Sequence, residues 1–222
     1  MANKQFVVIG IGRFGASLAK TLYSTGNDVL AIDKNEDLVQ DIADYVTHAV
    51  QMDATDENAI RTLGIRNFDV AVVSIGDNIQ ASIMVTLLLK EVGVKYIVAK
   101  GSNDLHAKVL KKIGADRVVL PEQDMGNRVA HNLLSSSILD FIELSEDYSV
   151  MEIEVIDAWD GNTLQELKLR TKYGINVMAI KNGKKVKVSP SAETALNSGD
   201  ILVVVGSVEQ LTKIEEALAK LK

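Results

Sequence analysis

The chain has 222 residues, of which 47% are hydrophobic and 24% are charged, a balance typical of a globular protein with room for one larger and one smaller domain. Its formal net charge of −6 disfavours nucleic acid as a partner, because neutralising phosphates requires a basic face. The chain contains no cysteine, which excludes disulfides, thiolate metal sites and a cysteine nucleophile.

The N-terminal segment predicts a strand, a tight turn and a helix that together bind a nucleotide. Residues 6–9 form an apolar run typical of a buried parallel strand. Gly10, Gly12 and Gly15 follow at GxGxxG spacing, which permits a tight turn, close approach of a ligand and contact between helix and sheet. The helix start would direct unpaired N–H groups at a phosphate. Asp33 ends the next apolar run, where a carboxylate can accept hydrogen bonds from a ribose; the alternative is an ordinary strand-end or capping residue.

Strand and helix patterns alternate onward to about residue 120, which predicts an α/β fold with a doubly wound parallel sheet of about six strands. The strands are expected at 6–9, 29–32, 49–51, 69–75, 96–100 and 117–120. Asn35 and Thr55 are expected to cap the second and third helices. The turn at 76–78 should flank the nucleotide, because ligands of open α/β sheets bind at the carboxyl ends of the strands. The N-terminus leads directly into the first strand without room for a signal peptide, so we expect a soluble, cytoplasmic protein.

The helix expected at 78–92 has apolar side chains on nearly every face. They are Ile79, Ile83, Met84, Val85, Leu87, Leu88 and Leu89. The apolar part is far shorter than the ~20 residues that span a bilayer, so we do not expect direct membrane insertion. One side of such a helix normally faces solvent, so we expect a second subunit to cover it in a homo-oligomer. The alternative is that the chain's own second domain shields it.

A change of pattern after about residue 140 predicts a second, smaller α+β domain. We place a Rossmann domain at 1–140, including a crossover helix at about 122–137, and the smaller domain at 145–222, with residues 135–137 and 143–149 as the boundary. Its elements are expected at 150–156, 164–167, 177–181, 185–188, 201–205 and 208–221. Asn182-Gly183 between two strands predicts a hairpin with a type I′ turn.

Five blocks of the sequence resemble, in the same order, those of the RCK (KTN) gating proteins of Trk/Ktr-type potassium uptake systems. The blocks are GIGRFGASL, HAVQMDATDEN, SIGDNIQAS, KKIGADRVVLPEQDMG and LRTKYGINVMAIK, and the resemblance covers nearly the whole chain. It is greatest to the cytosolic KtrA/KtrC-type subunit, which has an RCK-N domain followed by an RCK-C domain. The resemblance implies a ring-shaped homo-octamer docked on the cytoplasmic face of a separate membrane-embedded potassium transporter. It also implies a location peripheral to the inner face of the cell membrane.

The resemblance further implies a site for ATP or ADP, formed by the glycine loop and neighbouring strand ends. Its residues are Gly10, Gly12, Arg13, Phe14, Gly15, Asp33, Asn35, Asp53, Ala54, Gly76 and Lys100. Arg13 would bind the terminal phosphates of ATP through charge-assisted hydrogen bonds. The alternative is a solvent-facing arginine, poorly placed because a cation at a helix start opposes the dipole. For the residues beyond the glycine loop and Asp33, an ordinary turn or cap role is the alternative.

Two further ligands are implied by the resemblance. Glu122 matches a position that coordinates a divalent cation, Mg²⁺ or Ca²⁺, between subunits near the γ-phosphate; waters and other subunits would have to supply the remaining oxygens. The second domain resembles a receptor for cyclic di-AMP, whose bridging phosphates suit an arginine. The residues at that pocket are Arg170, Asn176, Val177, Ile180 and Pro190. The chain departs from the family pattern at Ala192, where a second proline is common.

Residues for catalysis are missing from the sequence. His48, His106 and His131 are scattered and not at metal-ligand spacing, and there is neither a GxSxG elbow nor a Walker A lysine loop. We therefore predict a regulator that senses ATP and ADP, and not an enzyme, with the two nucleotides favouring different ring shapes. One alternative is a regulator that senses NAD or NADH. Another is a small NAD-dependent oxidoreductase, in which Asp33 would disfavour the 2′-phosphate of NADP.

Overall fold

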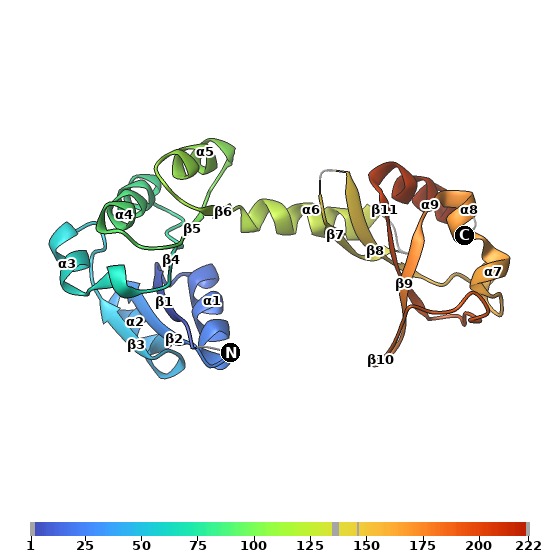
Figure 1. Cartoon of the computed structure of the whole chain (residues 1–222), viewed down its shortest axis with the longest axis horizontal. Coiled ribbons are helices and arrows are strands. Elements are labelled where there is room, and N and C mark those ends of the chain that lie inside the picture. The colour runs from blue at the N-terminus through green and yellow to red at the C-terminus, as the bar shows by residue number, and fades with distance from the viewer. Residues whose placement is uncertain (1–2, 135–137, 146, 221–222) are drawn as a thin grey trace. The chain divides into compact units, whose positions relative to one another are not determined.

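The computed structural model describes residues 3–134, 138–145 and 147–220. The chain divides into two compact units, residues 1–122 and 123–222 (Figure 1). The division falls near the start of helix α6 (Pro121–Leu134), which the sequence places in the first domain. The domain bounds of 140 and 145 therefore stay a prediction, and part of the expected boundary, residues 135–137, lies outside the described residues.

The first unit contains a six-stranded sheet in which every neighbouring pair of strands is parallel. Its strands are β1 (Gln5–Ile9), β2 (Asp28–Asp33), β3 (His48–Gln51), β4 (Val70–Val73), β5 (Ile97–Lys100) and β6 (Arg117–Val119). In the order β3-β2-β1-β4-β5-β6, the chain adds strands on one side of β1 up to β3 and then on the other side from β4 onward. This switch creates a crevice at the carboxyl ends of β1 and β4. The predicted doubly wound sheet is confirmed.

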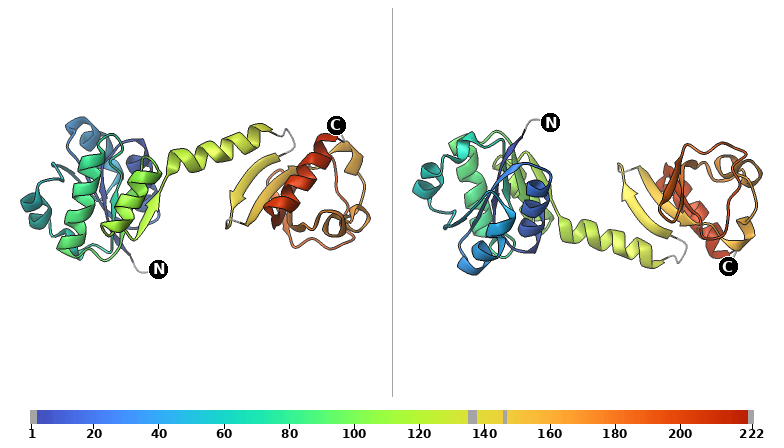
Figure 2. Two further views of the ribbon diagram at one scale, coloured as in Figure 1. Left: turned by 90° about the horizontal axis from the view of Figure 1, so that it is seen from above. Right: turned by 90° about the horizontal axis from the view of Figure 1, so that it is seen from below.

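Helices cover both faces of this sheet (Figure 2). They are α1 (Arg13–Ser24), α2 (Glu36–Ile42), α3 (Glu57–Thr62), α4 (Ile79–Val92) and α5 (Asp104–Lys112), with 3₁₀ turns at Ala43–Tyr45 and Ile65–Asn67. Because side chains of a strand alternate between faces, Val7 and Ile9 pack with buried residues of α3, α4 and α5, whereas Val8 packs with those of α1 and α2. Both faces of β1 are thus buried, which explains its continuous apolar run.

Helix capping agrees with the sequence at one position and differs at another. Asn35 caps α2 as predicted, since its side chain accepts a hydrogen bond from the Asp37 amide at 2.9 Å. The prediction for Thr55 is wrong, because Asp56 caps α3 by accepting hydrogen bonds from the backbone amides of Asn58 and Ala59. Asp56 and Thr55 are both favourable capping residues. Thr55 is engaged elsewhere, with both its amide and its hydroxyl donating to Asp53.

Helix α4 is not buried all round within this chain. Val85 and Leu89 face the core, whereas Ile79, Met84 and Leu87 each keep about two fifths of their surface exposed, at 43%, 43% and 42%. A cover for this exposed apolar strip remains an expectation. Among residues 3–134, 138–145 and 147–220, no helix combines the length and apolarity needed to cross a lipid bilayer.

The second unit is built on a five-stranded antiparallel sheet, as expected for a small α+β domain. The strands are β7 (Ile138–Glu143), β8 (Tyr148–Glu154), β9 (Asn176–Asn182), β10 (Lys185–Val188) and β11 (Ile201–Ser207), in the order β10-β9-β11-β8-β7. Helices α7 (Leu164–Leu167), α8 (Leu169–Tyr173) and α9 (Val208–Lys220) and a 3₁₀ turn at Asp157–Trp159 complete it. Alternate residues of β11 are buried in a core shared with α9. The sequence predicts neither β7 nor α8.

The hairpin between β9 and β10 forms as predicted, but its turn type is different. Asn182 pairs with Lys185 across the ladder, so the two turn residues are Gly183 and Lys184 and not Asn182-Gly183. Gly183 has a positive φ of 53°, whereas Lys184 is not among the residues with positive φ. A type I′ turn needs positive φ at both central positions, and a type II′ turn needs it only at the first. The turn therefore has the φ pattern of type II′.

A buried carboxylate connects the strands of the second unit, which leads to a prediction. Asp200 is 3% exposed and accepts hydrogen bonds from the Asn182 side-chain amide at 2.6 Å and the Asn197 backbone amide at 2.9 Å. We expect Asp200→Ala to lower the free energy of unfolding by about 2–3 kcal/mol, because three donors, two of them from Asn197, lose a charged acceptor. Urea unfolding monitored by fluorescence of Trp159, the single tryptophan, measures this loss.

The matched control is Asp157→Ala in the same unit. Asp157 is exposed, and its side chain contacts the Ser198 hydroxyl at a long 3.4 Å. This change is expected to alter stability by less than about 0.5 kcal/mol. Equal losses for the two variants would contradict the assigned role of Asp200.

Candidate functional site

The three glycines of the first turn have three different structural roles. Gly10 has φ +94°, and a Cβ there would lie 3.0 Å from backbone atoms at the end of β4. A Cβ on Gly15 would lie 1.9 Å from the Gly10 carbonyl oxygen and 2.5 Å from the Ser74 hydroxyl. At Gly12, no atom lies within 4 Å of the same position. The turn is therefore tight at the first glycine, packed against the sheet at the third and open at the second.

Hydrogen bonds of the Asp33 carboxylate hold this loop against the end of β2. Its Oδ2 accepts a hydrogen bond from the Ile11 amide at 2.6 Å, and its Oδ1 accepts one from the Asn35 amide at 2.9 Å. Each carboxylate oxygen has two acceptor sites, so both oxygens retain capacity for a further donor such as a ribose hydroxyl. The fingerprint spacing predicts the ligand role of Asp33 but does not reveal its bond to the loop.

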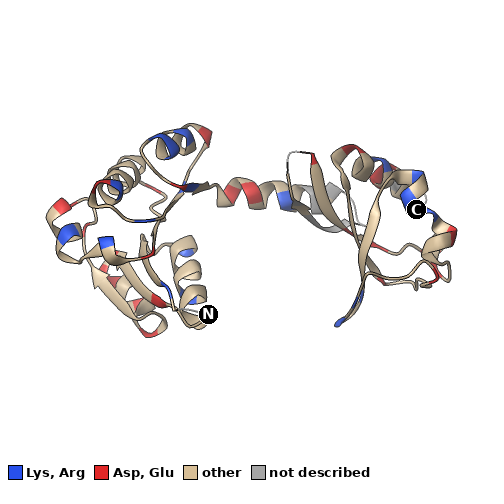
Figure 3. Cartoon of the chain, viewed as in Figure 1, with Lys and Arg blue, Asp and Glu red and all other residues tan. Residues whose placement is uncertain are grey.

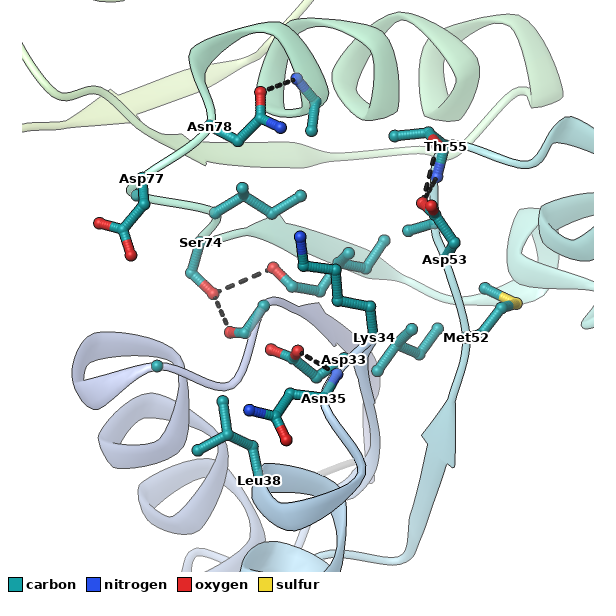
Figure 4. Close-up of a pocket in the computed structure, with 18 residues that line it drawn as sticks. Asp33, Lys34, Asn35, Leu38, Met52, Asp53, Thr55, Ser74, Asp77 and Asn78 are labelled. Atoms are coloured by element: carbon teal, nitrogen blue, oxygen red, sulfur yellow. Dashed lines mark hydrogen bonds between the residues drawn. The ribbon is translucent and has the colours of Figure 1, made fainter.

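A pocket of about 380 Å³ lies at the carboxyl ends of β1, β2, β3 and β4 (Figure 4). Seven residues of the predicted nucleotide site line it: Gly10, Gly12, Asp33, Asn35, Asp53, Ala54 and Gly76. The predicted residues Arg13, Phe14, Gly15 and Lys100 lie outside its lining. Asp77 and Asn78, from the turn at 76–78 that is expected to flank the nucleotide, also line the pocket. Further lining residues were not predicted, among them Lys34, Leu38, Met52 and Thr55. Their nearness to the strand ends is the one signal that could have identified them.

Asp53 brings a negative charge to the β3 side of this pocket. Its Oδ1 accepts hydrogen bonds from the Thr55 hydroxyl at 2.7 Å and the Thr55 amide at 2.9 Å. These two bonds, in that order, hold the pKa of the Asp53 carboxyl below its ordinary value, and the positive charge of Lys34 adds to the effect. Figure 4 shows Lys34 extending into the space that separates Asp33 from Asp53. The pocket thus combines carboxylate acceptors with an ammonium donor.

A charged cluster of Arg13, Lys100 and Glu122 adjoins the glycine loop. The Lys100 ammonium lies 2.5 Å from Glu122 Oε1 and 5.9 Å from the centroid of the Phe14 ring. It would lie 3.4 Å from a Cβ placed on Gly76, a lining residue of the pocket. The hydrogen bond from Lys100 holds the pKa of Glu122 below its ordinary value, and the charge of Arg13 lowers it further. The cluster therefore places cations beside the start of α1.

Among the described residues, Glu122 does not belong to a complete metal site. In the described part of the chain, no group of three or more His, Asp or Glu residues could hold a metal ion. His48 is exposed, and the His131 side chain lies outside the described residues. His106 is buried, its Nδ1 contacts the Ser102 amide at 3.2 Å, and burial lowers the pKa of its imidazole. The acidic positions at the start of α6, visible in Figure 3, suit a helix N-terminus in any case.

The five residues predicted to bind cyclic di-AMP lie on or near strand β9 of the second unit. Arg170 on α8 and Asn176 at the start of β9 are exposed, and Pro190 is half-buried. Val177 packs against the core, and Ile180, at 6% exposed, is a member of it. Within one chain, Ile180 therefore serves the core of this unit.

Comparison with known proteins identifies both units. Residues 6–121 match the TrkA-N domain family model, and residues 150–219 match that of the TrkA-C domain. The chain is 51% identical to the Ktr system potassium uptake protein C of Bacillus subtilis, over 99% of this chain and 100% of the relative. It is 39% identical to the Ktr system potassium uptake protein A of Vibrio alginolyticus, over 94% of this chain and 95% of the relative.

Solved structures give the same picture of the fold. The RCK domain of GsuK superposes over 99% of this chain with a TM-score of 0.55 and 27% identity. The GsuK channel bound to NAD superposes over the same share with a TM-score of 0.55 and 25% identity. This chain spans 47% and 39% of those two longer chains.

Because the glycines have different surroundings, we expect glycine-to-alanine substitutions at Gly12 and Gly15 to change the free energy of unfolding by different amounts. Gly15→Ala places Cβ within 1.9 Å of a backbone oxygen, so α1 must move away from the sheet. We expect it to lower the free energy of unfolding of the first unit by about 3 kcal/mol, as overpacking does. Gly12→Ala, with φ −66° and open space, should change it by less than about 0.5 kcal/mol. Thermal unfolding by circular dichroism measures both, and a Gly15→Ala variant as stable as Gly12→Ala would contradict the tight packing.

Proposed function

The chain belongs to the family of Ktr-type potassium uptake proteins built from a TrkA-N and a TrkA-C domain, and from this premise we propose that it is a nucleotide-sensing regulatory subunit. The first unit binds ATP or ADP, and the nucleotide state controls a separate membrane-embedded potassium transporter. Support for the partner comes from the names of the relatives, which are components of Ktr potassium uptake systems.

The observation that carries the nucleotide proposal is the open space at Gly12, at the start of α1. Helix N-termini have amide groups without intrahelical acceptors, and the glycine turn leaves room for phosphate oxygens to approach them. Asp33 and Asn35 lie at the end of β2, where a ribose is bound in related folds. The residues present therefore fit an adenine nucleotide, which would supply the negative phosphates that this loop is suited to hold.

ATP is favoured over a dinucleotide by the charged cluster. Arg13 and Lys100 contribute two cations beside the loop, and a guanidinium forms strong charge-assisted bonds with terminal phosphates, which ATP has and a dinucleotide lacks. The alternative, a regulator that senses NAD or NADH, is favoured by the likeness to the GsuK channel bound to NAD. The third candidate function is that of a small NAD-dependent oxidoreductase. Turnover of nicotinamide absorbance with small carbonyl substrates would favour it.

The remaining ligands and the assembly are also proposals. We propose a homo-octameric ring on the cytoplasmic side of the membrane, in which other subunits cover the exposed apolar strip of α4. We further propose that Glu122 and oxygens from outside this chain hold Mg²⁺ or Ca²⁺ near the nucleotide. Cyclic di-AMP binding at Arg170, Asn176, Val177, Ile180 and Pro190 of the second unit stays a prediction from family resemblance.

Calorimetric titration with ATP, ADP and NADH, each with and without Mg²⁺, tests the nucleotide proposal. Arg13→Gln is expected to weaken ATP binding about 10- to 100-fold, the loss typical of a charge-assisted hydrogen bond, and ADP binding much less. The control is Arg61→Gln, since Arg61 forms an exposed ion pair with Glu57 on α3. This control should bind both nucleotides like the unchanged protein.

Two outcomes would contradict the proposal in different ways. If NADH binds far more tightly than ATP and ADP, the sensor responds to redox state. If Arg13→Gln weakens ATP and ADP equally, Arg13 does not distinguish the terminal phosphate, and another group must do so.

A further inference from the structure

We propose that Lys100 is shared between Glu122 and the phosphates of the bound nucleotide, so that phosphate binding breaks the Lys100–Glu122 ion pair and releases the Glu122 side chain. This inference rests on the proposed function, because it assumes that a nucleotide binds at the glycine loop. It adds a regulatory step to that site, in which the nucleotide exchanges one intramolecular contact for another.

The two partners of the ion pair differ strongly in their surroundings. The Lys100 side chain is 13% exposed at the end of β5, whereas the Glu122 side chain is 72% exposed on the first turn of α6. The ammonium is thus held in place by the fold, and the carboxylate can turn into water. Ion pairs with such an exposed partner are weak, because water solvates the released charge. Glu122 is therefore the partner that leaves when a competitor arrives.

The position of the ammonium makes a phosphate that competitor. Lys100 Nζ lies 3.4 Å from the position of a Cβ on Gly76, which lines the pocket, and 5.9 Å from the Phe14 ring in the first turn of α1. A phosphate has more oxygen acceptors and more negative charge than a carboxylate, so it attracts an ammonium more strongly. It also repels Glu122, which has the same sign of charge.

Release of Glu122 has a defined structural consequence. Glu122 is the second residue of α6, the helix that leads from the first unit into the second, and its bond to Lys100 ties the start of this helix to β5. A released carboxylate remains favourable at a helix N-terminus, so the helix itself need not unwind. The freed oxygens also become available to a cation. Nucleotide binding would then come before cation binding at this carboxylate.

Carbodiimide cross-linking gives a direct readout of the ion pair, because it joins an amine and a carboxylate that are already in contact. The chain offers an internal reference in Lys95–Asp69, an exposed pair at 3.2 Å that lies at the opposite, amino edge of the same sheet. Peptide mass spectrometry quantifies both cross-links. Saturating ATP is expected to lower the Lys100–Glu122 yield at least threefold and to leave the Lys95–Asp69 yield unchanged.

Binding measurements without divalent cations provide the second test. Glu122→Gln should tighten ATP binding about three- to tenfold, because Lys100 no longer has to leave a partner. Lys100→Gln should weaken binding, and adding Glu122→Gln to it should restore little, since the competition has been removed. A simple loss of negative charge would instead tighten binding equally in both backgrounds. Asp69→Asn is the matched control for the removed charge and should leave the affinity unchanged.

The outcomes separate this inference from the function on which it rests. If ATP binds the unchanged protein but both cross-links persist, or if Glu122→Gln tightens binding equally with and without Lys100, the exchange is refuted and nucleotide sensing stands. If none of the nucleotides binds, the proposed function and the exchange are refuted together. A selective, ATP-dependent loss of the Lys100–Glu122 cross-link, with the expected non-additivity, supports the exchange.

Discussion

Helix α1 approaches the sheet so closely that its position determines the shape of the glycine loop in the first unit. Gly15 has no side chain, so the helix start can lie against the Gly10 carbonyl and Ser74. The Ser74 hydroxyl donates to the backbone oxygens of Ile9 and Gly10, which fixes the turn from the β4 side. Asp33 fixes it from the β2 side through the Ile11 amide. The loop is thus held on two sides and left open at Gly12, where a ligand can approach the amides of the helix.

The sequence predicts the fold of the first unit well because its signals are local and consistent. Apolar runs mark strands that are buried on both faces, and their alternation with helices restricts the sheet to a parallel, doubly wound arrangement. The second unit was less predictable. Strand β7 follows serines that resemble a linker, and α8 begins directly after Lys168, a residue in the left-handed region with φ 50° that separates it from α7. The hairpin turn lies one residue later than the Asn-Gly pair predicts, because strand register also determines which residues form the turn.

The candidate site was predictable to the extent that strand ends define it. Gly10, Asp33 and Gly76 could be predicted because carboxyl ends of neighbouring parallel strands meet at one edge, whereas Asp53 was implied only by the family resemblance. Side-chain direction could not be read from the sequence, so the entry of Lys34 into the pocket was missed. The contact between Lys100 and Glu122, which are 22 residues apart, depends in addition on where α6 begins.

The lining of the pocket comes from four strand ends and reaches from Ile9 to Ala81, with no single segment supplying enough of it to recognise a ligand. Strands β1 and β4 are neighbours in the sheet although more than sixty residues separate their paired positions. Such non-local pairing is slow to form, because a long loop must be closed first. Competence to bind therefore requires the folded sheet of this unit and cannot reside in one local segment. A newly synthesised chain would not bind the nucleotide until its first unit had folded.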